Sequence, residues 1–547
     1  MSNSDIHQWS GSPPHLHPEF DVESLQQYLN YLGSSIPANL FAQVDPDFYQ
    51  ENYADYLQAN SDPVEFFFQH GWKLGHQPNQ WFQTDFYLGK YGDIREAGVN
   101  PFEHFLFHGF RENRHYSAIS MNSLLDVVNK RSNQDPLNLL YRSTNQPPMA
   151  SVEQVFQEIK LRFWPDSIRH VVAFGHDNYT RHIGGIQIVV GVEQQQFEAT
   201  NTNYIFIFPS HPRLTLAPLQ PAPTFQFIVN GKLIPLRCEL TGILEKLGDL
   251  EALVVHSIYG HEPAIIAQES QTVPIKHFVW WVHDYSANCE NHLLAHNNSR
   301  SCNDPPPDSQ ICLTCTHGAR RVEHVNRIQH LVNAAPWRFV APSESAKTIS
   351  ASGSSRLPNP EVVPHGEISF SGSRGPFDPQ QRKVRIAFVG QPVQHKGWKV
   401  FLQLVDFSKS RRLPVEFFHL GSLASDSNGI NYIKLSQTSS NLGLTTELLL
   451  EHNIDAVFIW SIHQETFNLV TYESMAAGCV IIARAGSGNI AAAALSHDRS
   501  LTYENEIDLF SDEQIVERIM QKVLHGLPTG HFVFTGTTFA MIGGDRP

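Results

Sequence analysis

The segment Ile459–Ile490 reads IWSIHQETFNLVTYESMAAGCVIIARAGSGNI and combines a loop, a helix pattern, a small-residue turn and an apolar run. Its periodicity predicts a helix over Phe467–Ala477 and a parallel strand, covered on both faces, over Cys479–Ala483. Glu465 stands before or at the start of that helix, and Glu473 lies about two turns further on. The first turn of a helix offers free N–H groups and a positive dipole end, which suit a diphosphate. Two acids at this spacing are also typical of a solvated surface helix.

Length and composition limit the classes of protein that the chain can belong to. A length of 547 residues predicts several domains. The net charge of −15 argues against a general nucleic-acid binder, so no nucleic-acid partner is expected. The sequence has no apolar run long enough to span a membrane and no secretory leader pattern at its start. We therefore expect a cytoplasmic protein.

An internal repeat stands near the N-terminus. Two sequence patterns recur at a spacing of 38 residues: Phe-Tyr-x3-Tyr-x-Asp at 48–55 and 86–93, and Pro-x-Glu-x-Phe-x2-His-Gly at 63–71 and 101–109. Residues 45–117 therefore predict two 38-residue helical repeats with an aromatic core. Their role is either packing alone or docking and polysaccharide contact. The polar residues 1–44 are expected to be a flexible segment, and residues 118–168 a connector.

From residue 169 the pattern changes to short apolar strands that alternate with helices, which predicts parallel sheets. We expect one Rossmann-like domain over 169–367, a Gly-, Ser- and Pro-rich hinge over 368–382, and a second such domain over 383–525. The last residues, 526–547, lack helical periodicity and are expected to form an irregular tail. The predicted fold class is α/β, with two Rossmann-like domains facing a cleft, preceded by a small all-α repeat region.

In the first of these domains, two features follow predicted strands, and open parallel sheets bind ligands at the carboxyl ends of strands. Gly184-Gly185 lies between a strand and a helix, which is the place of a ligand-approach loop, although loops often carry glycines. His283 follows the strand His277–Val282 and is expected to face the cleft. The alternative is a structural histidine that Asp284 satisfies.

In the second domain, Gly390 ends the first predicted strand and Lys396 stands at the following strand-to-helix turn. A mobile ammonium at that place would neutralise a diphosphate. The alternative is an ordinary solvated lysine.

Four cysteines cluster in an insertion over residues 286–318: Cys289, Cys302, Cys312 and Cys315. The last two form a Cys-x2-Cys pair, a spacing that suits tetrahedral zinc, and four thiolates would leave no open position for catalysis. The cluster therefore predicts a structural zinc site. Reduced, unliganded cysteines are the alternative.

The segment Glu465-Thr-Phe-Asn-Leu-Val-Thr-Tyr-Glu473 resembles the E-x7-E segment of the retaining GT-B glycosyltransferases of family 4, the "glycosyl transferases group 1" type. Other features in the same order, over roughly residues 170–525, are Gly184-Gly185, His283, Pro364-His365-Gly366 and Lys396-Gly397. The resemblance implies that Glu465 faces the donor sugar and Glu473 the nucleotide ribose. It implies catalytic roles for His283 and Glu465, and donor binding by Gly184, Gly185, Lys396, Gly390, Phe467, Asn468, Leu469 and Glu473.

The resemblance also implies an activity. Such an enzyme moves a sugar, with retention, from a nucleotide diphosphate sugar to a hydroxyl of a glycan or lipid-linked acceptor, and it needs no catalytic metal. The aromatic repeat resembles a unit found beside transferases of bacterial surface polysaccharides. That setting implies cell-surface polysaccharide biosynthesis and is compatible with peripheral contact at the inner face of the membrane.

Two other functions remain in view. Gln391 stands where the family commonly has an arginine, which favours a catalytically weak or inactive scaffold of polysaccharide assembly as the alternative. A dinucleotide-dependent oxidoreductase would need G-x-G-x-x-G after its first strand, and Gly184-Gly185 lacks that spacing.

Overall fold

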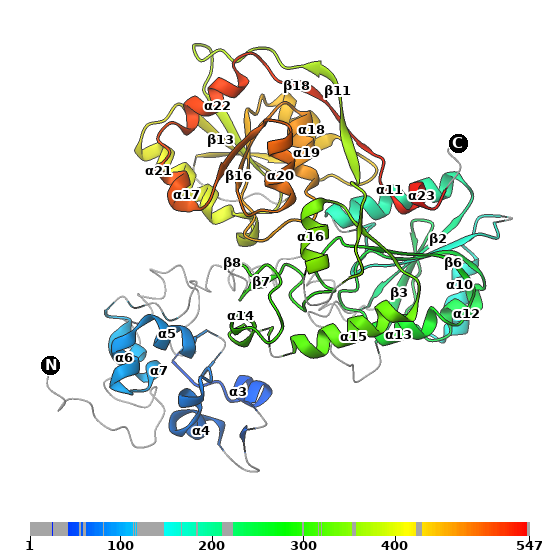
Figure 1. Ribbon diagram of the computed structural model, residues 1–547, viewed down its shortest axis with the longest axis horizontal. Coiled ribbons are helices and arrows are strands. Elements are labelled where there is room, and N and C mark those ends of the chain that lie inside the picture. The colour runs from blue at the N-terminus through cyan, green and yellow to red at the C-terminus, as the bar shows by residue number, and fades with distance from the viewer. Residues whose placement is uncertain are drawn as a thin grey trace. The chain divides into compact units, whose positions relative to one another are not determined.

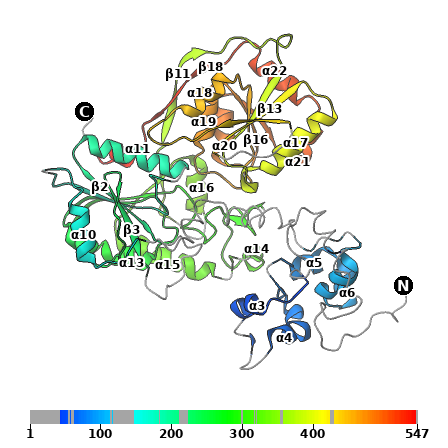
Figure 2. The ribbon, with the colours of Figure 1, turned by 180° about the vertical axis from the view of Figure 1, so that it is seen from behind.

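A computed structural model describes residue 25 and residues 42–53, 56–57, 62–79, 81–112, 114, 116, 147–165, 167–181, 184–210, 223–297, 300–315, 317–318, 320–352, 357–422 and 429–543. The chain forms two compact units, Met1–Asn145 and Gln146–Pro547 (Figures 1 and 2). The expected flexible segment 1–44 lies almost wholly outside the described residues, and so does most of the expected connector.

Short helices build the first unit. They are α3 (Pro46–Tyr53), α4 (Pro63–Gln69), η3 (Gly71–Leu74), α5 (Thr84–Lys90), α6 (Gly92–Ala97), α7 (Pro101–His104) and η4 (Phe105–Gly109). Helices α4 and α7 both begin at a proline, and the side chains of Asp62 and Asn100 cap them. The buried core of this unit is largely aromatic and includes Tyr49, Phe67 and Phe102.

One close contact occurs twice in this unit, at positions 38 residues apart. A Cβ placed on Gly71 would lie 2.0 Å from the hydroxyl oxygen of Tyr49, and a Cβ on Gly109 would lie 2.2 Å from that of Tyr87. Any larger residue at either glycine would displace a buried tyrosine. Glycine at these two positions therefore keeps the aromatic cores closed.

The first α/β domain holds, within the described residues, an eight-stranded sheet of order β10-β9-β6-β5-β1-β2-β3-β4. Its strands are β1 (His170–Phe174), β2 (Asn203–Pro209), β3 (Phe225–Val229), β4 (Lys232–Leu233), β5 (Leu250–Val255), β6 (Ile275–Trp281), β9 (Arg338–Ala341) and β10 (Glu361–Val362). All pairs are parallel except β2 with β3 and β3 with β4. The described helices are α10 (Val152–Lys160), α11 (Gly185–Ala199), α12 (Ile243–Leu247), α13 (Pro263–Glu269), α14 (Gln310–Leu313), α15 (Arg321–Ala334) and α16 (Glu344–Ser352).

The second α/β domain has a six-stranded parallel sheet of order β14-β13-β12-β15-β16-β17 among its described residues. The strands are β12 (Val384–Val389), β13 (Val415–Gly421), β14 (Ile430–Lys434), β15 (Ala456–Ile459), β16 (Val480–Arg484) and β17 (Ser500–Tyr503). The helices are α17 (Trp398–Ser410), α18 (Leu444–Glu451), α19 (Leu469–Ala476), α20 (Asn489–Ser496), α21 (Glu506–Ser511) and α22 (Ile515–Val523). In chain order the strands read 3-2-1-4-5-6, which is the Rossmann arrangement.

The last part of the chain returns to the first domain and corrects one prediction. Strand β18 (Pro528–Phe534) pairs antiparallel with β11 (Gly366–Ser373), and α23 (Thr538–Met541) contacts α11. Figures 1 and 2 show β11 and β18 side by side, and Figure 1 shows α23 beside α11. The expected irregular tail over 526–547 is therefore wrong. It was missed because the strand's partner is distant in the sequence, so no local pattern marks it.

Two Rossmann-like sheets joined by this crossing constitute the GT-B fold, and the predicted fold class is confirmed. Two boundaries differ from prediction. The hinge expected from residue 368 begins inside β11, and α10 belongs to the first α/β domain, where Val155 and Ile159 are in the core. Among the described residues, no helix is long and apolar enough to cross a membrane.

Candidate active site

The carboxyl ends of the two sheets meet at one loop of the second domain. His283 follows β6 and Ser343 follows β9, while Thr466 lies in the loop after β15. The Thr466 hydroxyl donates to the His283 carbonyl oxygen at 2.7 Å, and the Ser343 hydroxyl donates to the Thr466 carbonyl oxygen at 2.6 Å. These bonds hold the loop that carries Glu465 against the first domain.

The backbone of Glu465 is fixed by the loop that precedes α20. Its N–H donates to the Ser487 carbonyl at 3.2 Å, and its carbonyl accepts from the Asn489 N–H at 3.0 Å. Gly488 between them has φ +66°, and a Cβ there would lie 2.7 Å from the Glu465 carbonyl oxygen. Glycine at 488 therefore permits the close approach that positions Glu465.

The side chain of Glu465 combines burial with nearby positive charge. Burial raises the pKa of its carboxyl group, while the Lys396 ammonium and a hydrogen bond from Asn468 lower it. The Nε2 atom of His463 lies 3.6 Å from Glu465 Oε1. Burial lowers the pKa of His463 to about 3, and the charges of Lys396 and Arg484 act in the same direction. His463 is therefore neutral at physiological pH, and Lys396 and Arg484 are the cations that act on this loop.

Lys396 lies where the sequence placed it, at the turn between β12 and α17. It ends the short helix η5 (Gln394–Lys396), and its side chain is exposed. Gly397 follows with φ +84°, and a Cβ there would lie 2.4 Å from Trp460. A Cβ on Gly390 would lie 4.0 Å from the Lys396 Nζ atom, so the ammonium is next to the glycine turn after β12. This arrangement leaves an exposed cation beside an open backbone turn.

Helix α19 begins two residues later than predicted, at Leu469 instead of Phe467. The reason is the cap: the Asn468 side-chain oxygen accepts from the Thr471 N–H at 3.0 Å, which makes Asn468 the N-cap residue. Phe467 lies outside the helix and stacks on Tyr472 with ring centroids 4.5 Å apart. Residues 467–469 thus form the helix entry, immediately after Glu465.

Glu473 is buried within α19. The side chain of Gln437 donates to its carboxylate, and the Thr446 hydroxyl donates to its backbone carbonyl at 3.1 Å. Burial raises the pKa of Glu473 to about 7, although the hydrogen bonds from Gln437 and Thr445 oppose the shift. Glu473 therefore changes charge near neutral pH.

His283 is buried, and both of its ring nitrogens are engaged by other histidines. Its Nε2 atom lies 2.9 Å from His256 Nδ1, and its Nδ1 atom lies 3.2 Å from His365 Nε2. Asp284, the partner considered from the sequence, accepts instead from the hydroxyls of Ser257 and Ser286. The ring of His283 thus belongs to a histidine cluster, and its backbone carbonyl makes the contact with Thr466.

The Gly184-Gly185 pair begins α11. Gly184 is the N-cap in an extended conformation, and a Cβ on Gly185 would meet nothing within 4 Å among the described residues. Further along the helix, a Cβ on Gly191 would lie 2.3 Å from the Ser439 hydroxyl of the second domain. Helix α11 therefore packs closely against the second domain, with its N-terminal glycines at the carboxyl end of β1.

Four buried polar atoms around this region have no hydrogen-bond partner among the described residues. They are Tyr285 Oη, Gln394 Oε1, Ser487 Oγ and Asn489 Oδ1. The charge of Glu465 raises the pKa of Tyr285, in addition to the effect of burial. Ser487 and Asn489 form backbone hydrogen bonds with Glu465, and Gln394 lies in the same short helix as Lys396. Buried polar atoms are normally satisfied, so unpaired atoms gathered around one acid and one cation point to a polar ligand.

Arg484 and His463 are site residues that sequence reasoning missed. Arg484 ends β16 and donates to the carbonyls of Ser461 and Ile462 at 3.1 and 2.9 Å. These hydrogen bonds fix the backbone between the end of β15 and Glu465, and the guanidinium adds positive charge next to that loop. The sequence did contain a signal for Arg484. It directly follows the predicted strand Cys479–Ala483, and ligands bind at the carboxyl ends of parallel strands.

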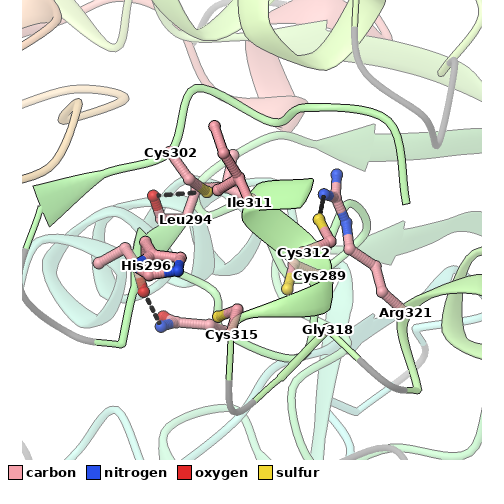
Figure 3. Close-up of a pocket in the computed structure, with 11 residues that line it drawn as sticks. Cys289, Leu294, His296, Cys302, Ile311, Cys312, Cys315, Gly318 and Arg321 are labelled. Atoms are coloured by element: carbon pink, nitrogen blue, oxygen red, sulfur yellow. Dashed lines mark hydrogen bonds between the residues drawn. The ribbon is translucent and has the colours of Figure 1, made fainter. Parts of the chain in front are cut away.

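The four cysteines do come together, around a cavity of about 10 Å³ in the first domain (Figure 3). The Arg321 guanidinium, which also pairs with Asp304, donates to Cys312 Sγ at 2.8 Å, and Cys302 Sγ donates to the Leu294 carbonyl at 3.1 Å. Among the described residues, no group of three or more histidine, cysteine or acidic side chains is arranged to hold a metal ion. The zinc prediction for Cys289, Cys302, Cys312 and Cys315 is therefore not supported, since an arginine occupies the approach to one thiol.

Comparisons with known proteins give structural likeness only. No family model and no curated protein matches the sequence. The structure is similar to HepE of Anabaena in complex with UDP-glucose, with 13% identity, 65% of this chain and 92% of that chain covered, and a TM-score of 0.39. It is similar to the lipopolysaccharide outer core galactosyltransferase WaaB (10%, 65% and 94%, 0.39) and to WaaG, a glycosyltransferase involved in lipopolysaccharide biosynthesis (9%, 65% and 94%, 0.37). Because these values are low, we base the function on this chain's own residues.

Proposed function

We propose that the protein is a glycosyltransferase that takes a sugar from a nucleotide diphosphate sugar. The observation that carries this proposal is an exposed ammonium, Lys396, whose charge acts on a half-buried acid, Glu465, where the ends of the two sheets meet. Unpaired polar atoms around these two groups are suited to the hydroxyls of a sugar. A diphosphate between Lys396 and the start of α19 would bring its sugar to Glu465.

Each of these residues then has a chemical role. Lys396 stabilises the negative charge that builds on the departing diphosphate, the missing side chain of Gly390 lets that diphosphate approach the turn after β12, and the N–H groups of the Leu469 turn donate to the phosphates. The Glu473 carboxylate accepts hydrogen bonds from the ribose hydroxyls. Glu465 accepts from a hydroxyl of the donor sugar and holds that sugar in place for attack.

We further propose that the transfer retains the anomeric configuration. The bond from the anomeric carbon to the phosphate oxygen breaks, and the acceptor oxygen bonds to the same face of that carbon. The acceptor's proton passes to the departing phosphate oxygen, so the step needs neither a covalent nucleophile nor a metal. The anomeric proton coupling in the first-formed product checks this point, and an inverted coupling would refute it.

The acceptor is proposed to be a glycan or a lipid-linked glycan of a bacterial surface polysaccharide. The aromatic helical unit over residues 45–117 is suited to hold such a chain, because exposed aromatic side chains bind sugar faces. Tyr56 of this unit is 54% exposed, although most of its rings are buried. An inactive scaffold is the second candidate, because Gln391 supplies no charge where a cation would assist the phosphate.

Donor affinity tests the phosphate site. Calorimetry with a panel of nucleotide diphosphate sugars, beginning with UDP-glucose, should show binding that Lys396→Ala weakens by about tenfold or more, since one charge-assisted contact is lost. Lys399→Ala is the matched control, because this exposed lysine is only three residues further along the chain. Equal affinity of the wild type and Lys396→Ala would exclude the proposed phosphate site.

A further inference from the structure

A line of four buried titratable side chains runs through the first domain, and its last histidine contacts Phe467 in the loop that carries Glu465. Glu193 lies on α11, His256 follows β5, His283 follows β6, and His365 precedes β11. The distances along the line are 3.2 Å from Glu193 Oε1 to His256 Nε2, 2.9 Å from His256 Nδ1 to His283 Nε2, and 3.2 Å from His283 Nδ1 to His365 Nε2. The line ends at 3.2 Å between His365 Nδ1 and the Gly536 carbonyl oxygen.

Counting protons along this line shows that three neutral histidines cannot satisfy it. Each of the four contacts needs one hydrogen, and the Gly536 carbonyl at one end can only accept. Three neutral imidazoles carry three N–H groups in total. Either one contact faces two lone pairs inside the core, which is costly, or the line holds a fourth proton.

The surroundings of Glu193 show where the fourth proton is. Its Oε1 atom accepts from the Tyr204 hydroxyl at 3.1 Å, and its Oε2 atom accepts from the Thr538 N–H at 2.8 Å, so donors face both oxygens. Burial alone would raise the pKa of Glu193, but His256 and the Thr538 N–H bring it below its ordinary value. Burial and neighbouring histidines hold the pKa of His283 well below the usual range, and burial lowers that of His365 to about 4. Because donors face both of its oxygens, Glu193 is the acceptor at this end of the line, and His256, the histidine in contact with it, carries the fourth proton.

We infer that Glu193 and His256 form a buried carboxylate–imidazolium pair which fixes the tautomers of His283 and His365. The protonated His256 donates through Nε2 to Glu193 and through Nδ1 to His283 Nε2. His283 then donates through Nδ1 to His365 Nε2, and His365 donates through Nδ1 to the Gly536 carbonyl. All four contacts are satisfied, and the pair as a whole is electrically neutral. Besides these groups, Tyr204 and His176 are the titratable side chains of the described residues that act on the line.

This inference rests on the proposed function in one respect, because it makes Glu193 a positioning residue for the same site. The carbonyl of His283 holds Thr466, the neighbour of Glu465, and the His365 ring lies edge-on to Phe467 with centroids 5.1 Å apart. Both ends of the line also contact the same short segment. The Gly536 carbonyl lies at hydrogen-bond distance from His365 Nδ1, and the Thr538 N–H donates to the Glu193 carboxylate. The charged pair thereby ties the returning C-terminal segment to the loop of Glu465.

The protonation state can be observed directly in the wild-type protein, whether or not it is active. Long-range ¹H–¹⁵N correlation spectra of the full chain with ¹⁵N-labelled histidine distinguish an imidazolium from both neutral tautomers. At pH 9, ordinary histidines, with pKa values of about 6.5, are neutral. We expect one imidazolium to persist at pH 9. Spectra with no imidazolium at that pH would overturn the inference.

Two matched variants assign that signal. Glu193→Gln removes the carboxylate and should abolish the imidazolium at pH 9, whereas Glu198→Gln, five residues along the same helix and exposed, should keep it. A signal that survives in folded Glu193→Gln would place the proton elsewhere and overturn the inference. If Glu193→Gln does not fold, the wild-type spectrum still decides.

Activity gives a separate readout for the positioning role. Glu193→Gln should lower turnover by about tenfold or more while affinity for UDP-glucose stays within about twofold, because the phosphate contacts belong to the second domain. If the wild type transfers no sugar, the proposed function fails, but the histidine spectra still test the ion pair. If the imidazolium is absent while turnover is normal, only the ion pair fails.

Discussion

At the scale of single residues, Glu473 is a carboxyl group of the proposed site whose charge changes near neutral pH. Burial raises its pKa to about 7, so the carboxylate that we propose binds the ribose hydroxyls forms only as the pH passes neutrality. The folded state binds a proton that the unfolded chain, with an ordinary pKa of 4.5, releases. The contribution of Glu473 to stability therefore falls as the pH rises from about 4.5 through 7, and ligand affinity should rise over the upper part of that range.

We predict that the affinity for UDP-glucose increases about tenfold between pH 6 and pH 8, as Glu473 ionises. The diphosphate of this ligand is esterified at both ends and does not titrate in that range. Glu473→Gln should flatten the dependence and raise the free energy of unfolding at pH 8 by ~1–3 kcal/mol. Calorimetry at several pH values checks this, with the exposed Glu447→Gln as control; a pH dependence unchanged in Glu473→Gln would be incompatible with it.

Gly488 gives a second test at the residue scale. Gly488→Ala places a methyl group against the Glu465 backbone at a positive φ, which should cost ~1–3 kcal/mol of unfolding free energy and most of the activity. Gly486→Ala in the same loop is the control, because its nearest neighbour is the Arg484 guanidinium at 3.7 Å. Chemical denaturation of both variants distinguishes them, and equal stability would count against the proposed role of this loop.

At the scale of elements, the ribbon of β11 and β18 joins the two domains. It pairs residues 366–373 with 528–534 and is the covalent and hydrogen-bonded path by which the chain returns. A Cβ on Gly530 would lie 1.9 Å from the Ser369 carbonyl oxygen. The two strands can approach this closely only because residue 530 is a glycine, and any side chain there would push β18 away from β11.

We predict that Gly530→Ala separates β18 from β11 and makes the C-terminal segment accessible to proteases. The thermal midpoint should fall by several degrees, since a change of ~1 kcal/mol in a domain of this size moves it by about 2–4 °C. Gly375→Ala, in the loop after β11 with nothing within 4 Å of its Cβ among the described residues, should behave as the wild type. Limited proteolysis with mass analysis of the fragments gives the answer; a resistant Gly530→Ala protein would disprove the importance of the ribbon.

Local patterns predicted the elements whose cause is local. The helix expected over Phe467–Ala477 is α19 (Leu469–Ala476), shortened by the Asn468 cap, and the strand expected over Cys479–Ala483 is β16 (Val480–Arg484). Strand β18 was missed because its partner is far away in the sequence, and its apolar run has no period of its own. The placement of Lys396 beside Gly390 followed from the strand-turn-helix pattern.

Contacts between distant residues explain the rest of what the sequence did not predict. The line from Glu193 to His365 joins four separate segments, so nothing in the local sequence marks it. The spacing of the cysteines suggested a zinc site. Spacing alone does not reveal that the Arg321 guanidinium donates a hydrogen bond to Cys312. Packing between remote segments, and not the type of residue, decided both outcomes.

At the scale of the whole molecule, the two sheets meet through the loop that carries Glu465, and this loop contacts both domains. Ser343 and His283 hold it from the first domain, while Lys396 and Gly488 act on it from the second. The sugar transfer that we propose for this site would therefore require both domains together. The aromatic helical unit is a separate compact unit, and its removal should affect acceptor use more than donor binding.

The central claim is that the site around Glu465 and Lys396 cleaves a nucleotide diphosphate sugar. The most direct measurement is release of the nucleotide from a panel of such sugars by the full chain, with water or added glycans as acceptors. We expect release from at least one donor, a loss of about 100-fold or more in Glu465→Gln and in Lys396→Ala, and little change in Glu447→Gln and Lys399→Ala. No release from any donor, or release that Glu465→Gln and Lys396→Ala leave unchanged, would contradict the account.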